Sequence, residues 1–419
     1  MPDRPTGLFS PIRIGALELP ARLFKTATAE TRADAAGRVT DAVVDFYRLL
    51  AKGGTPLIIT GNLYVTRQGK SAPRQLGVDD DDKVAGLRRV TDMVHGHGGR
   101  IFAQLNHCGR QVVPDFVGAP EVVSASGVTD LLTGTRPRAL GADEIAALVT
   151  AFADAAGRCQ AAGFDGVQLH SANGYLLSQF LTPYTNRRGD AYGGDLENRT
   201  RIHREIVAAI RTRCGEAFPV IVKMNGADRL PLRAGLDTVA LVAIARRLEA
   251  AGVDAVEITV GHYESGFPMV CGSFGLCLRH MVEGSMAQLP WLRRNAMRLF
   301  RPLVAWVCDR LWPGREGFNL DYAPAFARAL TIPVICVGGF RTRAAMEGAI
   351  AGGQCDAVSA GRPFIADPFL FRHLRDGQAG PACVDCNGCV GHLGAQPADC
   401  YHPQVGAAKR AMLAREDAD

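Results

Sequence analysis

Three side chains that can bind and protonate a small molecule occur within six residues of one another. His170 directly follows an apolar run, residues 166–169, and Asn173 and Tyr175 come soon after it. An imidazole and an amide can donate hydrogen bonds to a carbonyl or anionic oxygen, and a phenol carries a transferable proton. A single histidine at a strand end is more often a packed or capping residue, but three such groups together favour a small reactive pocket.

Apolar runs alternate with amphipathic segments along most of the chain, as is typical of α/β proteins. The predicted strands are Leu23–Thr26, Leu57–Thr60, Ile101–Leu105, Val167–His170, Val220–Met224, Val256–Thr259, Val334–Val337 and Ala357–Ala360. The predicted helices include Asp41–Lys52, Asp82–His97, Asp143–Ala162, Leu196–Arg213, Asp237–Ala251 and Arg343–Ala351. Eight strand–helix units predict a (β/α)₈ TIM barrel over residues 1–380, with its chemistry at the carboxyl ends of the strands. A doubly wound sheet is the alternative fold, but no G-x-G-x-x-G sequence follows a predicted strand.

The segment from His170 to Arg201, HSANGYLLSQFLTPYTNRRGDAYGGDLENRTR, closely resembles the signature of the Old Yellow Enzyme family of flavin-dependent ene-reductases. The resemblance extends over residues 7–262 and 317–376. It implies a barrel that binds FMN without a covalent bond, with NADH or NADPH as the electron donor. It also implies that His170 and Asn173 hold the carbonyl or nitro oxygen of the substrate, and that Tyr175 supplies a proton.

Small and polar residues at the ends of the first three strands fit a flavin at the barrel mouth. Ala27 and Thr28 follow the first strand and Gly61 follows the second, so the backbone can approach a flat ring. Gln104 lies in the run QLNHCGR, which resembles the family's Q-L-x-H-x-G-R, and its amide can both donate and accept at the pyrimidine edge of the flavin. Relatives carry Thr or Cys where this chain has Ala29, so a hydrogen bond that tunes the flavin is missing here.

Later strand ends predict a cation beside the flavin and a phosphate site. Lys223 ends the fifth strand, where many relatives have Arg, and a cation under the pyrimidine carbonyl stabilises an anionic reduced flavin. The alternative is a solvated lysine, which the preceding apolar run Val220–Val222 disfavours. Barrels of this type commonly bind phosphate through the loops after strands seven and eight. Those loops supply Gly338, Gly339, Gly361 and Arg362.

Composition is that of an ordinary globular protein. The 419 residues are 47% hydrophobic and 21% charged, and a formal net charge of +5 is too small to indicate a nucleic-acid partner. The start lacks the layout of a signal peptide, and no apolar run reaches membrane-spanning length. Twelve cysteines, most of them scattered singly, suit reduced thiols in the cytoplasm better than a disulfide framework.

An insertion that a barrel does not require lies after the sixth strand, at residues 262–316. Its core, Leu292–Leu311, has an apolar face and an arginine-rich face, and Pro302 is expected to kink or divide the helix. The favoured interpretation is a helical hairpin that covers the barrel mouth or forms a contact in a homo-oligomer. The alternative is peripheral membrane contact through residues 291–312, because tryptophan and leucine opposite a basic face suit an interfacial helix.

A short C-terminal extension, residues 381–419, contains four cysteines spaced like metal or iron–sulfur ligands. They are Cys383, Cys386, Cys389 and Cys400. Larger relatives such as 2,4-dienoyl-CoA reductase hold a four-iron cluster in a similar place, with a middle spacing about one residue longer. The favoured interpretation is a group of reduced thiols, and the alternative is an iron–sulfur cluster or a zinc ion.

The sequence therefore predicts an FMN-dependent oxidoreductase that transfers hydride from NAD(P)H to a small activated alkene. Three alternatives stay open. A family member could use the same flavin as a dehydrogenase, demethylase or isomerase. A barrel of the tRNA-dihydrouridine synthase type would need a basic RNA-binding domain, which the C-terminal stretch does not resemble. A scaffold without turnover is suggested by Ala29 and by the insertion.

Overall fold

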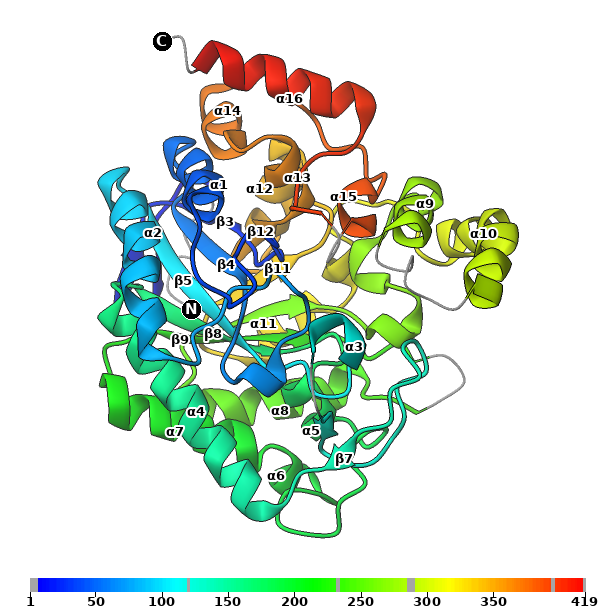
Figure 1. The fold of residues 1–419 in the computed structure, drawn as a ribbon. Helices are drawn as coiled ribbons and strands as arrows, with labels where there is room; N and C mark the ends of the chain where they lie inside the picture. The colour runs from blue at the N-terminus through cyan, green and yellow to red at the C-terminus, as the bar shows by residue number, and fades with distance from the viewer. Residues whose placement is uncertain (1–6, 119–120, 231–233, 285–290, 393–395, 417–419) are drawn as a thin grey trace.

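Eight parallel strands close into a barrel in the order β10-β11-β12-β3-β4-β5-β8-β9. The computed structural model describes residues 7–118, 121–230, 234–284, 291–392 and 396–416, and Figure 1 shows helices packed around the barrel. The barrel strands are β3 Leu23–Lys25, β4 Leu57–Tyr64, β5 Arg100–Asn106, β8 Gly166–Ser171, β9 Val220–Asn225, β10 Ala255–Thr259, β11 Val334–Val337 and β12 Ala357–Ala360. The predicted TIM barrel is confirmed, and each predicted strand overlaps one of these.

Helices cover the outside of the barrel. The longer ones between the strands are α1 Asp41–Lys52, α2 Val84–Gly96, α4 Ala142–Ala161, α7 Arg201–Cys214, α8 Thr238–Ala250, α11 Ala323–Ala329 and α12 Arg343–Ala351. The predicted bounds of α1 and α12 are reproduced. The predicted helix over residues 196–213 is instead two helices, because α6 Leu196–Arg199 ends at Thr200, whose hydroxyl donates to the carbonyls of Leu196 and Glu197.

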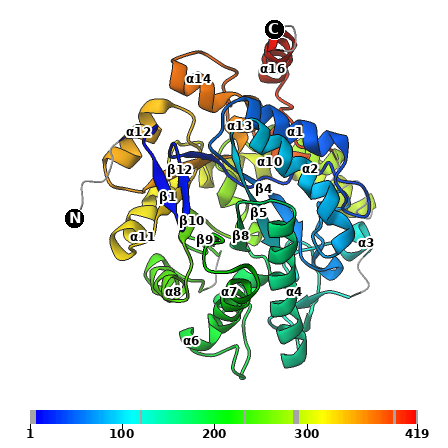
Figure 2. The same cartoon turned by 90° about the vertical axis from the view of Figure 1, so that its left-hand side faces the viewer.

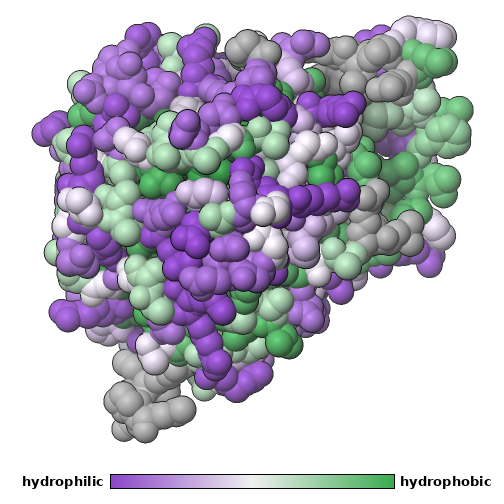
Figure 3. All heavy atoms as spheres, turned by 90° about the horizontal axis from the view of Figure 1, so that it is seen from below, coloured by the Kyte–Doolittle hydropathy of each residue, from purple (hydrophilic) through white to green (hydrophobic). Residues whose placement is uncertain are grey.

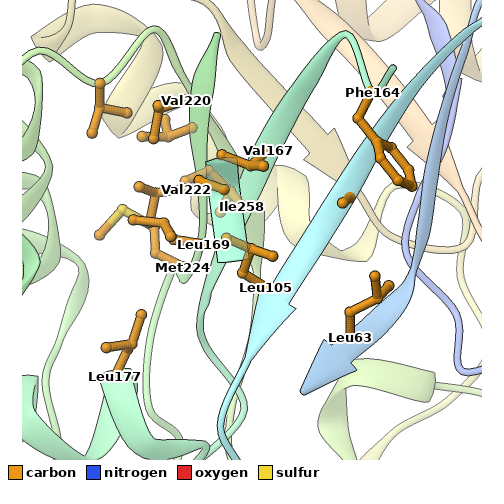
Figure 4. Close-up of a cluster of buried hydrophobic side chains, with 14 of the residues drawn as sticks. Leu63, Leu105, Phe164, Val167, Leu169, Leu177, Val220, Val222, Met224 and Ile258 are labelled. Carbon is orange, nitrogen blue, oxygen red and sulfur yellow. The ribbon is translucent and has the colours of Figure 1, made fainter. Parts of the chain in front are cut away.

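The main apolar core lies between the strands and the helices. Successive side chains of a strand point alternately into the barrel and toward the helices. On β9, Val220, Val222 and Met224 belong to the outer core together with Phe152 of α4 and Ile206 of α7. Figure 4 shows the three β9 side chains in this cluster beside those of β8. The residues between them on β9 therefore point into the barrel.

A short hairpin closes the amino-terminal end of the barrel. Strands β1 Ile12–Ile14 and β2 Leu17–Leu19 pair antiparallel. Ile12 and Ile14 pack in one cluster with Phe24, Phe102 and Ile221, which come from the barrel strands. Figure 2 shows β1 beside the barrel strands. This apolar plug, which sequence reasoning did not predict, leaves the carboxyl end of the barrel for polar chemistry.

The insertion after β10 is helical, as predicted. Its described part contains the single turns η3 Tyr263–Ser265 and η4 Pro268–Val270, followed by helices α9 Gly275–Glu283 and α10 Trp291–Leu311. Figure 1 shows α9 and α10 at the edge of the molecule. Pro302 lies inside α10, so it does not divide this helix, and the expected kink stays a prediction. Among the residues with described positions, no helix is long and apolar enough to cross a membrane.

The C-terminal part folds back against the barrel. It contains α13 Arg362–Ala366, α14 Leu370–Asp376, α15 Gly388–Gly391 and α16 Pro403–Glu416. The backbone N–H of Ala398 donates to the carbonyl of Glu30 at 2.9 Å, so the extension is joined to the loop after β3. Residues 393–395 and 417–419 of the predicted extension, like 285–290 of the insertion, lie outside the described residues.

Candidate functional site

A pocket at the carboxyl ends of the strands brings together nearly all the predicted site residues. Its lining includes His170, Asn173, Tyr175, Ala27, Thr28, Gln104, Lys223, Gly338, Gly339, Gly361 and Arg362. Gly61 is not among the lining residues. Its N–H donates to the hydroxyl of Tyr47 at 2.9 Å, and a Cβ at this position would lie 1.8 Å from Glu30 Oε2. The next residue, Asn62, lines the pocket in its place.

A chain of hydrogen bonds crosses the barrel interior beneath this pocket. Gln104 Nε2 donates to Gln168 Oε1 at 2.7 Å, and Gln168 Nε2 donates to Glu257 Oε2 at 3.0 Å. Lys223 Nζ lies 3.1 Å from the same carboxylate oxygen and donates to the hydroxyl of Thr26 at 2.9 Å. Because a buried charge is costly without a partner, Lys223 and Glu257 hold each other in place.

Glu257 is ionised despite its burial. Burial opposes its negative charge, but Lys223 and the hydroxyl of Ser359, which donates at 2.5 Å, hold the pKa of the carboxyl below its usual value. Sequence reasoning missed Glu257 and Gln168. The sequence did contain a signal, because each of these polar residues lies inside an otherwise apolar strand. Gln168 is also two residues before His170, so the two side chains point to the same face of the strand.

Burial keeps the imidazole of His170 neutral. It lowers the pKa of this side chain to about 3, and the positive charge of Lys223 acts in the same direction. Nε2 lies 3.4 Å from Asn173 Oδ1, while Nδ1 is buried and has no hydrogen-bond partner among the described residues. A neutral imidazole with an unused ring nitrogen can bind a polar atom of a ligand.

The backbone and the amide of Asn173 fix its position. Its φ of +59° is left-handed, a conformation that asparagine tolerates better than most residues. Its Nδ2 donates to the carbonyls of Val260 and Gly261 at 3.2 and 3.3 Å, so its Oδ1 faces His170. Holding a substrate oxygen through the amide N–H groups of Asn173 would require one of these carbonyls to be released.

Tyr175 keeps its proton beside His170. The two ring centroids are 4.6 Å apart, and the hydroxyl of Tyr175 donates to the hydroxyl of Tyr263 at 3.3 Å. Burial raises the pKa of Tyr175 well above its usual value, and Tyr263 adds to the effect. Tyr263, which lines the same pocket, was missed by sequence reasoning because only the fold brings the loop after β10 next to the start of α5 Leu176–Leu181.

Both additions to the barrel border the pocket. Phe267, Met269 and Val270 come from the insertion, and Cys389 and Val390 come from the extension. Their side chains are apolar or weakly polar, so this wall favours an apolar ligand. The insertion therefore lies on the carboxyl side of the barrel, as expected for a segment that follows the sixth strand.

The two glycine-rich loops leave room for a phosphate group. Gly339 has a φ of +70°, and a Cβ there would lie 2.5 Å from the carbonyl oxygen of Arg315. A Cβ on Gly361 would lie 3.0 Å from Thr28 Cγ2. Arg362 stands beside these loops and is already ion-paired with Asp385 of the extension at 3.3 Å. A pocket that is lined by Gln104 and Lys223 and bordered by glycine backbone fits both parts of an FMN molecule.

The four cysteines of the extension line a second, smaller cavity. Cys383, Cys386, Cys389 and Cys400 all border it, and Cys389 also lines the main pocket. None of the four forms a disulfide, and burial raises the pKa of the Cys389 thiol to about 12. In the described ranges, no three His, Cys, Asp or Glu side chains are placed to hold a single metal ion.

The ionisation state of His170 is a direct test of this site. At about pH 5 an ordinary histidine is mostly protonated, whereas His170 should stay neutral because burial and Lys223 both disfavour its charge. Nitrogen NMR of isotope-labelled histidine measures this state, and His170→Asn identifies the signal. In Lys223→Met the pKa of His170 should rise but stay below the ordinary value, because burial is the larger cause. A midpoint near pH 6.5 for His170 in the unaltered protein would contradict the described burial.

Known proteins share both this sequence and this architecture. The chain is 35% identical over 390 residues to an NADH oxidase of Thermoanaerobacter brockii, covering 92% of this chain and 53% of that protein. It is 29% identical over 415 residues to a cinnamate reductase of Clostridium sporogenes, covering 94% of this chain and 56% of that protein. A solved 2-naphthoyl-CoA reductase complex matches with a TM-score of 0.80 and 26% identity, over 96% of this chain and 58% of that one.

The chain spans about half the length of these two curated relatives. The model of the NADH:flavin oxidoreductase / NADH oxidase family matches residues 7–263, which is more than half of this chain. The resemblance to Old Yellow Enzyme is confirmed, and this chain belongs to the NADH:flavin oxidoreductase / NADH oxidase family.

Proposed function

We propose that this chain is an FMN-dependent reductase that uses NADH or NADPH to reduce a small electron-poor alkene. The observation that carries the proposal is a neutral imidazole and a protonated phenol, His170 and Tyr175, side by side in one pocket. Alkene reduction needs a hydrogen-bond donor where negative charge develops and an acid for the adjacent carbon. The name of the cinnamate reductase supports this choice, since cinnamate contains a conjugated alkene.

FMN would be held by two groups of residues. Ala27, Thr28, Gln104 and Lys223 would surround the ring, and Gly338, Gly339, Gly361 and Arg362 would surround the phosphate. When bound, FMN supplies hydride transfer between NAD(P)H and the substrate. The ammonium of Lys223 places positive charge at this site, and its pairing with Glu257 keeps that charge at a fixed position.

His170 and Tyr175 have separate tasks in this proposal. His170, being neutral, carries one ring N–H, which binds the carbonyl oxygen of the substrate and stabilises the charge that develops there. Because Asn173 Oδ1 can only accept, it places that N–H on Nε2, 3.4 Å away, and the substrate oxygen would take this N–H over from Asn173. Tyr175 holds a proton at its hydroxyl and gives it to the α-carbon of the alkene.

Tyr263 gives Tyr175 a route for regaining a proton. It accepts the hydrogen bond of the Tyr175 hydroxyl and is partly exposed, whereas Tyr175 is buried. The residue after it, Glu264, forms a buried ion pair with Arg110 of the loop after β5. That pair fixes the segment that carries Tyr263, so the two phenols stay in contact.

Replacing the phenols separates the two half-reactions. Tyr175→Phe should leave flavin reduction by NADPH intact and slow alkene reduction by about a hundredfold, because the proton donor is lost. Tyr263→Phe should slow the same step less, by about tenfold. Stopped-flow absorbance with 2-cyclohexen-1-one measures both steps. Tyr192→Phe, which removes a hydroxyl bonded to Glu205, is the control. Unchanged rates of both half-reactions in Tyr175→Phe would rule out Tyr175 as the donor.

The main alternative is a different flavin-dependent reaction in the same pocket. A dehydrogenase or demethylase would take hydride from its substrate, and an isomerase would consume no NAD(P)H overall. The apolar wall of Phe267, Met269 and Val270 is compatible with each of these substrates. Stoichiometric NADPH consumption with the probe alkene distinguishes the reductase from all three.

We also propose that the four cysteines hold an iron–sulfur cluster rather than remain free thiols. All four border one cavity, and the cation Arg362 borders it too. Ligands of a multi-iron cluster bind different irons and therefore stand further apart than ligands of one ion. The absence of a single-ion site in the described part of the chain is compatible with that spacing. A cluster would supply one-electron transfer next to the flavin pocket.

Iron analysis tests the cluster. Protein purified without oxygen should contain about four irons and four sulfides per chain if the four cysteines hold a four-iron cluster, and about two of each if they hold a two-iron cluster. Cys386→Ser should lose most of this iron, whereas Cys214→Ser, at the end of α7, should retain it. If iron is absent even after anaerobic reconstitution with iron and sulfide, the sequence-based interpretation of reduced thiols is correct instead.

A further inference from the structure

Helix α10 presents its apolar side to solvent. Leu292, Leu299 and Leu303 are 73%, 74% and 58% exposed. Phe300, Trp306 and Val307 are exposed beside them, and we call these six side chains the α10 stripe. Figure 3 shows hydrophobic surface gathered at the right-hand edge of the molecule, the side on which Figure 1 places α10.

The orientation of α10 is the reverse of that expected for a surface helix. The side of α10 that faces the protein contains small residues, and Ala305 and Cys308 pack there with Phe274 and Cys277 of α9. By helical periodicity the partly buried arginines 294 and 301 lie on this same inner side. A surface helix of a soluble protein normally turns its apolar stripe toward the core. The α10 stripe therefore faces a partner that the described residues of this chain do not supply.

The charge of α10 indicates what kind of partner fits. Between Trp291 and Leu311 the helix has five arginines and one acid. That acid, Asp309, already accepts a hydrogen bond from the backbone N–H of Phe274 at 2.6 Å. Arg298 and Arg310 are exposed, and the guanidinium of Arg310 lies 4.2 Å from the Trp306 ring centroid. A second copy of this helix would bring like charges together, whereas anionic headgroups above an apolar phase complement them.

We propose that the α10 stripe docks this chain on the surface of an anionic lipid bilayer, with α10 lying parallel to the membrane plane. Leucine, phenylalanine and tryptophan enter the boundary of the acyl chains, and the exposed Arg298 and Arg310 contact the headgroups. Docking also places the pocket near the membrane, because Trp312, directly after α10, packs with Phe267 and Val270 of the pocket wall. The inference does not depend on which substrate the pocket reduces.

Tryptophan fluorescence reports on this helix alone. All three tryptophans of the chain, residues 291, 306 and 312, lie on α10 or directly after it. Flavin-loaded protein is mixed with vesicles of phosphatidylcholine, alone or with about one third phosphatidylglycerol. The anionic vesicles should shift the emission to shorter wavelength and sediment the protein, and added salt should weaken both effects. The neutral vesicles should do so far less.

Paired variants separate the apolar and electrostatic contributions. Leu299→Glu with Leu303→Glu, and Arg298→Gln with Arg310→Gln, should each weaken vesicle binding by about tenfold or more. Val239→Glu is the matched control, because this valine of α8 is 79% exposed and lies outside the stripe. Flavin content and circular dichroism confirm that each variant is folded.

Two results would overturn the proposal. One is equal or absent binding of the unaltered protein to the two kinds of vesicle. The other is a dimer, seen by light scattering, that the two Leu→Glu changes dissolve while vesicle binding stays unaffected. That second result would assign the α10 stripe to a second copy of this chain.

Discussion

The buried ion pair between Lys223 and Glu257 is the constraint on which the site depends. Neither charge can remain inside the barrel without the other, and removing one partner of such a pair typically costs about 3–5 kcal/mol. Glu257 also accepts a hydrogen bond from the amide of Gln168, which in turn accepts one from Gln104. Strands β5, β8 and β10 are therefore fixed in relation to the lysine on β9. The same cation contributes to the lowered pKa of His170. This interaction therefore sets the charge beneath the pocket, and its lysine adds to the burial that keeps the imidazole above it neutral.

Contacts with the extension and the insertion complete the pocket that the barrel begins. Asp385 of the extension is ion-paired with Arg341 and with Arg362, which follow β11 and β12. Glu264 of the insertion is ion-paired with Arg110, which follows β5. Each buried acid thus ties an added segment to a barrel loop. A pocket whose walls come from the barrel, the insertion and the extension is held together by these pairs and by apolar packing.

Local patterns predicted the barrel well, because strand burial and helix amphipathicity are properties of short segments. The loop that carries His170 and Tyr175 was also predictable, because both residues lie in one short segment directly after a strand. Features that depend on distant parts of the chain escaped prediction. The strands of the β1–β2 hairpin do alternate apolar and charged residues, but each is only three residues long, which is too short for the pattern to stand out. Gly61 donates its N–H to the hydroxyl of Tyr47, a partner that comes from α1. The partnership of Tyr175 with Tyr263 joins loops after different strands. Pro302 was expected to kink or divide α10, and the helix continues through it.

The absorbance spectrum of the pure protein, recorded before and after anaerobic addition of NADPH, tests the central claim most directly. The account predicts the bands of an oxidised flavin, their loss on addition of NADPH, and their return when 2-cyclohexen-1-one is added. A folded protein that stays colourless after reconstitution with FMN would contradict it.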